Sequence, residues 1–257
     1  MVTRKKLNEK IYHRFDEGPA PVTAVFVHGA GGSHAVWTYQ FDVFNDILPC
    51  IFLDLPGHGQ SSGDSKNSIR EYSECLQEFL ELQSIENPLL IGHSMGSAII
   101  LQTALVLDNV MGLVFVGGGA RLKVAPVILE MITSNFSRAT QTIAKNLFAS
   151  STLDSFFRLV EQDMIACGQI GLLNDFSACN QFDAMDKLAT LSIPSLAIVG
   201  AKDAMTPPKY SHFLAEHIED CQLEIIAAAG HMVMAEQPAA FNEILSRFFR
   251  VQGQQVS

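Results

Sequence analysis

Ser94 stands between two glycines, Gly92 and Gly96, at the point where an apolar run ends and a helical pattern begins. Residues 87–91 read as a buried strand, and residues 98–105 read as a helix. The tight turn between them needs glycine on both sides of the serine, because a side chain there would collide with the neighbouring strand and helix. This strand–turn–helix pattern is typical of a nucleophile elbow. The sequence therefore predicts an enzyme with a nucleophilic serine.

Short apolar runs recur along the chain, and helical patterns lie between most of them. The runs cover residues 22–27, 51–53, 89–91, 113–116, 195–199 and 223–226. Such alternation predicts an α/β fold with a mainly parallel sheet covered by helices on both faces. In folds of this kind the reactive groups gather at the carboxyl ends of the strands.

Composition limits the class of protein and its partners. A chain of 257 residues with 48% hydrophobic content can bury one large core with an inserted segment. The net charge of −10 argues against a nucleic-acid partner, and the basic cluster Arg4-Lys5-Lys6 is too small to reverse this. No apolar run is long enough to span a bilayer, and no signal-peptide pattern follows the basic N-terminus, so we expect no stable membrane association. Five scattered cysteines fit reduced thiols in a cytoplasmic protein.

Two further polar residues follow the last two strand signals. Asp203 comes shortly after the run 195–199, and His231 follows the run 223–226 in a Gly-His context. A neutral serine hydroxyl is a poor nucleophile, so a histidine is needed to take its proton, and an aspartate to orient the imidazole. We assign these roles to His231 and Asp203. Asp183 and Asp186 are rivals that precede their strand, and a helix cap ahead of Pro207 is the alternative role of Asp203.

With these residues the chain resembles the α/β-hydrolase superfamily, and it looks most like the small capped carboxylesterase-like serine hydrolases. The order Ser94, Asp203, His231 is that of the family's catalytic triad. The resemblance extends from residues 28–33 through 54–61 to 230–231. It implies an eight-stranded sheet, a helical cap inserted after the sixth strand, and acyl-transfer chemistry.

Acyl transfer also requires donors for the oxyanion that develops in the transition state. The elbow supplies one, the backbone N–H of Met95 at the start of a helix. The family's oxyanion loop implies that the second is the N–H of Ala30, which follows His28-Gly29 at the end of the first apolar run. Gly31 and Gly32 allow the backbone to fold towards the nucleophile.

Strand signals disappear between residues 121 and 191, where apolar residues take helical spacing. We interpret 121–191 as a helical cap, and 1–120 with 192–257 as the core domain. Five apolar cap residues are candidates for the lining of an acyl pocket: Val127, Met131, Phe136, Phe156 and Phe157. The alternative is that such side chains pack the core of the cap itself, which holds for most of the apolar cap residues. Arg121 and Lys123, at the cap entrance, could contact a substrate anion or serve at the surface.

No metal site or cofactor is predicted. His212 and His217 are five residues apart, a spacing that splays them on a helix. The glycines near residues 29 and 117 lack the third glycine of a dinucleotide fingerprint, and no P-loop is present. We expect His28, Asp54 and His58 to brace loops near the site.

The sequence therefore predicts a cytoplasmic serine hydrolase that cleaves a small to medium carboxylic ester through an acyl-enzyme, without a cofactor. The triad leaves same-fold alternatives open: a thioesterase, a C–C hydrolase, a perhydrolase or a lyase. A ligand-sensing receptor with slow hydrolysis is the alternative from another class. Oligomeric state is not indicated.

Overall fold

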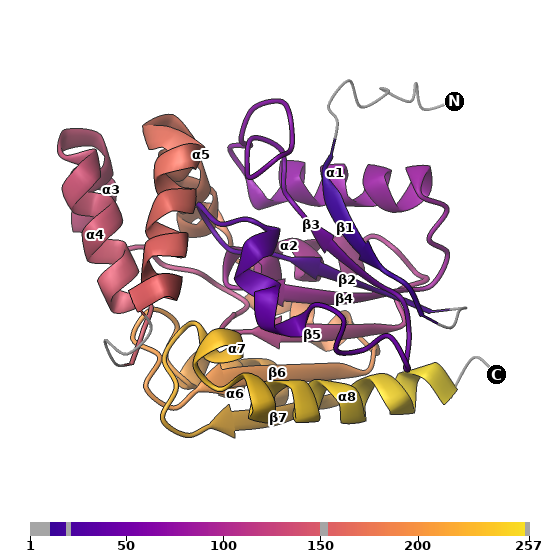
Figure 1. The fold of residues 1–257 in the computed structure, drawn as a ribbon. Coiled ribbons are helices and arrows are strands. Elements are labelled where there is room, and N and C mark those ends of the chain that lie inside the picture. Colours follow the sequence, from indigo (N-terminus) through magenta and orange to yellow (C-terminus); the bar gives the residue numbers. More distant parts are fainter. Residues whose placement is uncertain (1–10, 19–21, 150–153, 255–257) are drawn as a thin grey trace.

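A computed structural model describes residues 11–18, 22–149 and 154–254 (Figure 1). The basic cluster Arg4-Lys5-Lys6 lies outside these residues. The strands are β1 (His13–Asp16), β2 (Thr23–Val27), β3 (Cys50–Leu53), β4 (Pro88–His93), β5 (Gly112–Val116), β6 (Ser195–Gly200) and β7 (Cys221–Ile226). They form one sheet in the order β1-β3-β2-β4-β5-β6-β7. Only β1 is antiparallel to its neighbour, so the predicted α/β class with a mainly parallel sheet is confirmed.

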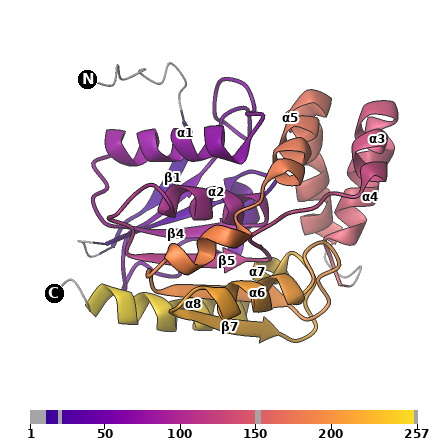
Figure 2. The ribbon, with the colours of Figure 1, turned by 180° about the vertical axis from the view of Figure 1, so that it is seen from behind.

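Helices cover both faces of the sheet (Figures 1 and 2). Alternate residues of β2 point to opposite faces: Phe26 packs against the core that includes Trp37 and Phe249, whereas Val25 packs against the core that includes Tyr72 and Ile99. The first core is covered by η1 (His34–Gln40) and α8 (Pro238–Gln254), and the second by α1 (Ile69–Leu82), α2 (Met95–Ala104) and α6 (Lys209–His217). Strands buried on both faces explain why their sequences are continuous apolar runs.

The expected number of strands needs a correction. Eight strands were implied, with the cap after the sixth, but the described residues form seven, and the helical insertion follows β5. Each of the six apolar runs is a strand. The seventh, β1, is a short edge strand of sequence HRFD, which carries no apolar run because it is only partly buried. The eighth strand was implied by the resemblance alone.

The insertion between β5 and β6 contains α3 (Pro126–Ser134), α4 (Phe136–Asn146), α5 (Asp154–Gln181) and the short η2 (Met185–Thr190). Figure 1 shows α3, α4 and α5 standing together at one end of the sheet. α5 is broken at Gly168, whose φ of 78° lies outside helical geometry. The two ends of the insertion meet where Arg121 and Asp183 form an isolated β-bridge and an ion pair of 3.2 Å. This contact brings together two residues near the ends of the segment 121–191. The interpretation of that segment as a separate cap stays a prediction.

Within the described part of the chain, none of the helices combines the length and the apolar character needed to cross a membrane.

Candidate active site

Ser94 sits in a strained turn at the carboxyl end of β4, the central strand of the sheet. It has φ 52° and ψ −113° and lies immediately before α2. Few residues other than glycine adopt a positive φ, and such strain persists only where the surroundings enforce it. A side chain on Gly92 would collide with the carbonyl of Gly96, and one on Gly96 would collide with the carbonyl of Val27. The elbow geometry therefore accounts for both glycines.

His231 and Asp203 meet in a buried pair. Nδ1 of His231 lies 2.8 Å from Oδ2 of Asp203, and the two side chains are almost wholly inaccessible to solvent. Oδ1 of Asp203 accepts hydrogen bonds from the backbone N–H groups of Met205 and Thr206, each at 2.9 Å. The hydroxyl of Thr206 lies 3.0 Å from Oδ2 of Asp203 and 2.7 Å from the carbonyl oxygen of Gly117, to which it donates. These contacts fix the carboxylate relative to the imidazole.

The surroundings of Asp203 favour its ionised form. Burial by itself would raise the pKa of Asp203, but the charge of His231 and the hydrogen bonds from His231 and Thr206 outweigh burial and lower it. An ionised Asp203 can hold the N–H of His231 at Nδ1, which leaves Nε2 to act as a base.

Two other buried histidines, His93 and His28, belong to this part of the core. Nε2 of His93 lies 3.1 Å from the carbonyl oxygen of His231, and the two rings are 4.7 Å apart. Burial and the nearby His231 lower the pKa of His93 to about 3. Burial and His58 lower the pKa of His28 to about 4. Both rings are therefore neutral at pH 7. For His28 this fits the predicted bracing role, because its Nε2 accepts from the N–H of Leu55.

Backbone donors lie close to Ser94. Met95 begins α2, and the first N–H groups of a helix have no partner within it. Ala30 lines the same cavity as Ser94. The N–H groups of its neighbours Gly31 and Gly32 are taken by Asp175 and by the carbonyl of Gly29, whereas that of Ala30 has no acceptor among the described residues. Ala30 and Met95 therefore remain the predicted donors for the oxyanion.

A cavity of about 240 Å³ joins these groups, because Ser94, His231, Ala30 and Thr206 all line it. Much of the remaining wall is apolar and comes from the insertion: Leu122, Val124, Ile128, Ile143, Leu147, Val160, Met164 and Phe176. Val36 of η1 adds a further apolar side chain from the core. Lys123 also lines the cavity, and its Nζ donates to the carbonyl of Asn180 at 3.3 Å. Arg121 instead pairs with Asp183 outside the cavity.

The predicted acyl pocket needs a correction, because its residues do not line this cavity: Val127, Met131, Phe136, Phe156 and Phe157. Val127 is 57% exposed, and the other four pack against the hydrophobic core. Adjacent residues of a helix point about 100° apart, so apolar spacing alone did not tell Val127 from its neighbour Ile128, which does line the cavity. Sequence reasoning also missed Thr206; its position three residues after Asp203 was the available signal.

A mainly parallel, helix-covered sheet with an elbow serine at the end of its central strand is the architecture of the α/β hydrolases. This chain belongs to the alpha/beta hydrolase family, whose model matches residues 24–244. It is a hydrolase.

Among similar proteins, 3-oxoadipate enol-lactonase 1 of Acinetobacter baylyi is 26% identical over 249 residues, which cover 91% of each chain. The pimeloyl-(acyl-carrier protein) methyl ester esterase of Neisseria meningitidis is 25% identical over 251 residues, covering 90% of this chain and 94% of that protein. An esterase from Exiguobacterium antarcticum has the same fold, with a TM-score of 0.88, 19% identity, and coverage of 94% of this chain and 96% of that one.

Proposed function

We propose that this protein is a serine esterase that hydrolyses small to medium carboxylic esters through an acyl-enzyme at Ser94. One observation carries the proposal: His231, which lies 2.8 Å from Asp203, lines the same cavity as the strained elbow serine. A serine, a base and an orienting acid around one cavity form the constellation that acyl transfer needs.

In this mechanism Nε2 of His231 takes the proton of Ser94 as the hydroxyl oxygen attacks the carbonyl carbon of the ester. Asp203 stabilises the imidazolium that forms, and the N–H groups of Ala30 and Met95 stabilise the oxyanion. His231 then returns the proton to the leaving alcohol. Water attacks the acyl-enzyme with His231 again acting as base, which releases the acid and restores Ser94.

The cavity supports an ester with a modest acyl group. Its volume of about 240 Å³ and its apolar wall suit a short hydrocarbon chain better than a large polar substrate. The names of two relatives, an enol-lactonase and a methyl ester esterase, describe proteins that act on cyclic and open-chain carboxylic esters. None of the five cysteines, all of which are among the described residues, forms a disulfide, which fits a cytoplasmic enzyme. The net charge of −10 does not favour a nucleic-acid partner.

Turnover of a substrate panel tests the proposal. We expect multiple turnovers on p-nitrophenyl acyl esters of two to eight carbons, with slower turnover of matched thioesters and anilides, and loss of turnover in Ser94→Ala. A single round of hydrolysis would favour a ligand-sensing role. Ester turnover by Ser94→Ala at the rate of the unaltered protein would overturn the proposal.

A further inference from the structure

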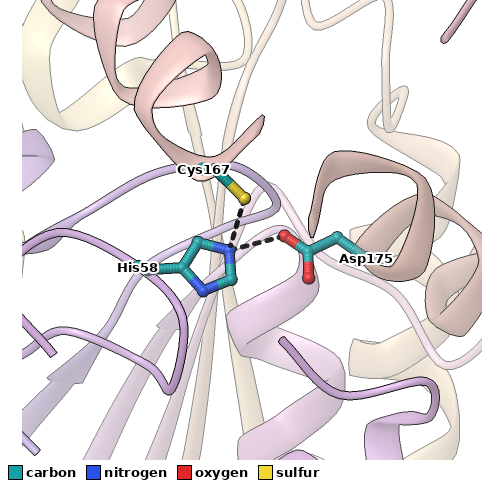
Figure 3. A group of neighbouring side chains, drawn as sticks. All are labelled: His58, Cys167 and Asp175. Atoms are coloured by element: carbon teal, nitrogen blue, oxygen red, sulfur yellow. Dashed lines mark hydrogen bonds and ion pairs between the residues drawn. The ribbon is translucent and has the colours of Figure 1, made fainter. Parts of the chain in front are cut away.

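A second group of polar side chains lies buried between the insertion and the core, and the esterase mechanism does not use it directly. It consists of His58, Cys167 and Asp175 (Figure 3). His58 comes from the loop after β3, and the other two come from α5, on either side of its break at Gly168. Nε2 of His58 lies 2.8 Å from Oδ2 of Asp175 and 3.4 Å from Sγ of Cys167.

Asp175 is fully buried and has hydrogen-bond donors at both oxygens. The phenol of Tyr72, on α1, donates to Oδ1 at 2.6 Å. The backbone N–H of Gly31 donates to Oδ2 at 2.8 Å, alongside His58. One carboxylate of the insertion therefore binds three separate segments of the core.

The protonation states of its neighbours match this arrangement. Burial by itself would lower the pKa of His58, but the charge and hydrogen bond of Asp175 outweigh burial, so the pKa of His58 lies well above its usual value. A protonated His58 donates from Nδ1 to the carbonyl oxygen of Pro56, 3.0 Å away, and from Nε2 to Asp175. Burial and the charge of Asp175 raise the pKa of Tyr72, which keeps its phenol a donor.

A metal ion is a poor occupant of this group. Binding would require His58 to give up the proton that it shares with Asp175, and would compete with the hydrogen bonds that Asp175 accepts from Gly31 and Tyr72. The protein's own donors already satisfy the carboxylate.

The contact with Gly31 links this group to the proposed oxyanion hole. Gly31 directly follows Ala30 and has a φ of 63°, in the left-handed region. A side chain there would lie 2.6 Å from Cδ1 of Leu172 and 2.8 Å from Cγ of Met164, so α5 packs directly on the loop. Asp175, which does not line the cavity, accepts the N–H of Gly31. The neighbouring N–H of Ala30 has no acceptor among the described residues, so it is the one left for the oxyanion.

We propose that Asp175, paired with His58, is a positioning residue that holds the oxyanion loop through the N–H of Gly31. Catalysis then depends on the position of helix α5 against the core. This inference rests on the proposed esterase function. Asp175 touches no reacting atom. Its effect should therefore appear in transition-state stabilisation rather than in substrate binding or in the nucleophilicity of Ser94.

The test uses Asp175→Asn in the full chain, with Asp163→Asn as the matched control. Asp163 is also on α5 and also binds the loop near residue 31, but its Oδ2 accepts from the Ser33 hydroxyl, at 2.6 Å, rather than from an oxyanion-loop amide. Rates are divided by the fraction of Ser94 that a fluorophosphonate labels once labelling has gone to completion, so that misfolded protein does not count and slower labelling is not mistaken for it. We expect Asp175→Asn to lower kcat about tenfold with KM changed less than twofold, and Asp163→Asn to change kcat less than twofold.

Affinity for an alkyl trifluoromethyl ketone gives a second readout, because its serine adduct places an oxyanion in the hole. We expect Asp175→Asn to weaken this inhibitor by the same factor as kcat/KM. If kcat per labelled site is unchanged in Asp175→Asn, or falls equally in Asp163→Asn, the proposal is wrong. If instead the unaltered protein is neither labelled nor active on esters, the proposed function itself has failed, and the two results are distinct.

Discussion

The backbone N–H of His231 donates a hydrogen bond to the carbonyl oxygen of Leu147, 2.9 Å away. Leu147 directly follows helix α4 as its C-cap, so the loop that carries the imidazole is hydrogen-bonded to the inserted segment. Glu236 adds a second fastening, because its two carboxylate oxygens accept from the N–H groups of Gly230 and Ala149 at 2.7 and 2.9 Å. The insertion therefore helps to hold His231 in place, in addition to supplying residues that line the cavity.

Loss of the Glu236 contacts should loosen the His231 loop. Glu236→Ala leaves the N–H groups of Gly230 and Ala149 without their acceptors, at a cost of roughly 2 kcal/mol of unfolding free energy. Glu236→Gln keeps an acceptor and should lose less. Urea unfolding and kcat on a p-nitrophenyl ester measure both effects. Equal stability and equal kcat in Glu236→Ala and the unaltered protein would show that the hydrogen bonds of Glu236 do not hold the His231 loop.

Asp203→Asn should reduce kcat by about 10³- to 10⁴-fold, because an amide cannot hold His231 in the tautomer that leaves Nε2 free. Asp183→Asn is the control, since Asp183 was a rival for the acid and its ion pair with Arg121 is partly exposed. That control should retain full kcat. A folded Asp203→Asn variant with the turnover of the unaltered protein would assign the acid to another residue.

Ile128, rather than Val127, should limit acyl chain length, because Ile128 lines the cavity and Val127 does not. In the unaltered protein each added methylene should raise kcat/KM about fourfold, from roughly 0.8 kcal/mol of burial, until the cavity is full. Ile128→Ala should move the optimum to acyl chains one or two carbons longer, and Val127→Ala should leave it in place. Profiles over esters of two to twelve carbons measure this. The same optimum in both variants would put the acyl group elsewhere.

Stability should fall as pH decreases below about 6.5. His28 and His93 have folded-state pKa values of about 4 and 3, below their ordinary value of 6.5. Between each folded-state pKa and 6.5, the unfolded chain therefore binds a proton that the folded chain does not. Each ring then contributes a slope of up to about 1.4 kcal/mol per pH unit. His58 acts oppositely: its pKa is raised, so its contribution is complete below 6.5 and is lost as pH rises through the folded-state value.

Urea unfolding between pH 4.5 and 8 measures these slopes. His93→Gln should reduce the slope of the unfolding free energy against pH, between pH 4.5 and 6.5, by up to the contribution of one proton. An acid-side slope that is the same in His93→Gln and in the unaltered chain would contradict the buried, neutral state of His93.

The sequence predicted the parts of this structure that depend on local pattern. The strand runs and the glycines around Ser94 are local signals, and chain order with strand ends predicted that Asp203 and His231 would meet. Lining residues such as Ile128 depend on how α3 is rotated against the core, which apolar spacing defines only to within a neighbouring position. Asp175 gave no sequence signal, because its partners His58, Tyr72 and Gly31 are 103 to 144 residues away.

Labelling of the purified protein with a fluorophosphonate, followed by peptide mass spectrometry, shows whether Ser94 is an activated nucleophile. Such a probe reacts with a serine that a base and an oxyanion hole activate together. We expect one adduct per chain, located on Ser94, that is absent in Ser94→Ala and forms far more slowly in His231→Ala. No adduct on Ser94, or an adduct that forms equally fast in His231→Ala, would contradict the assignment of Ser94 as a nucleophile activated by His231.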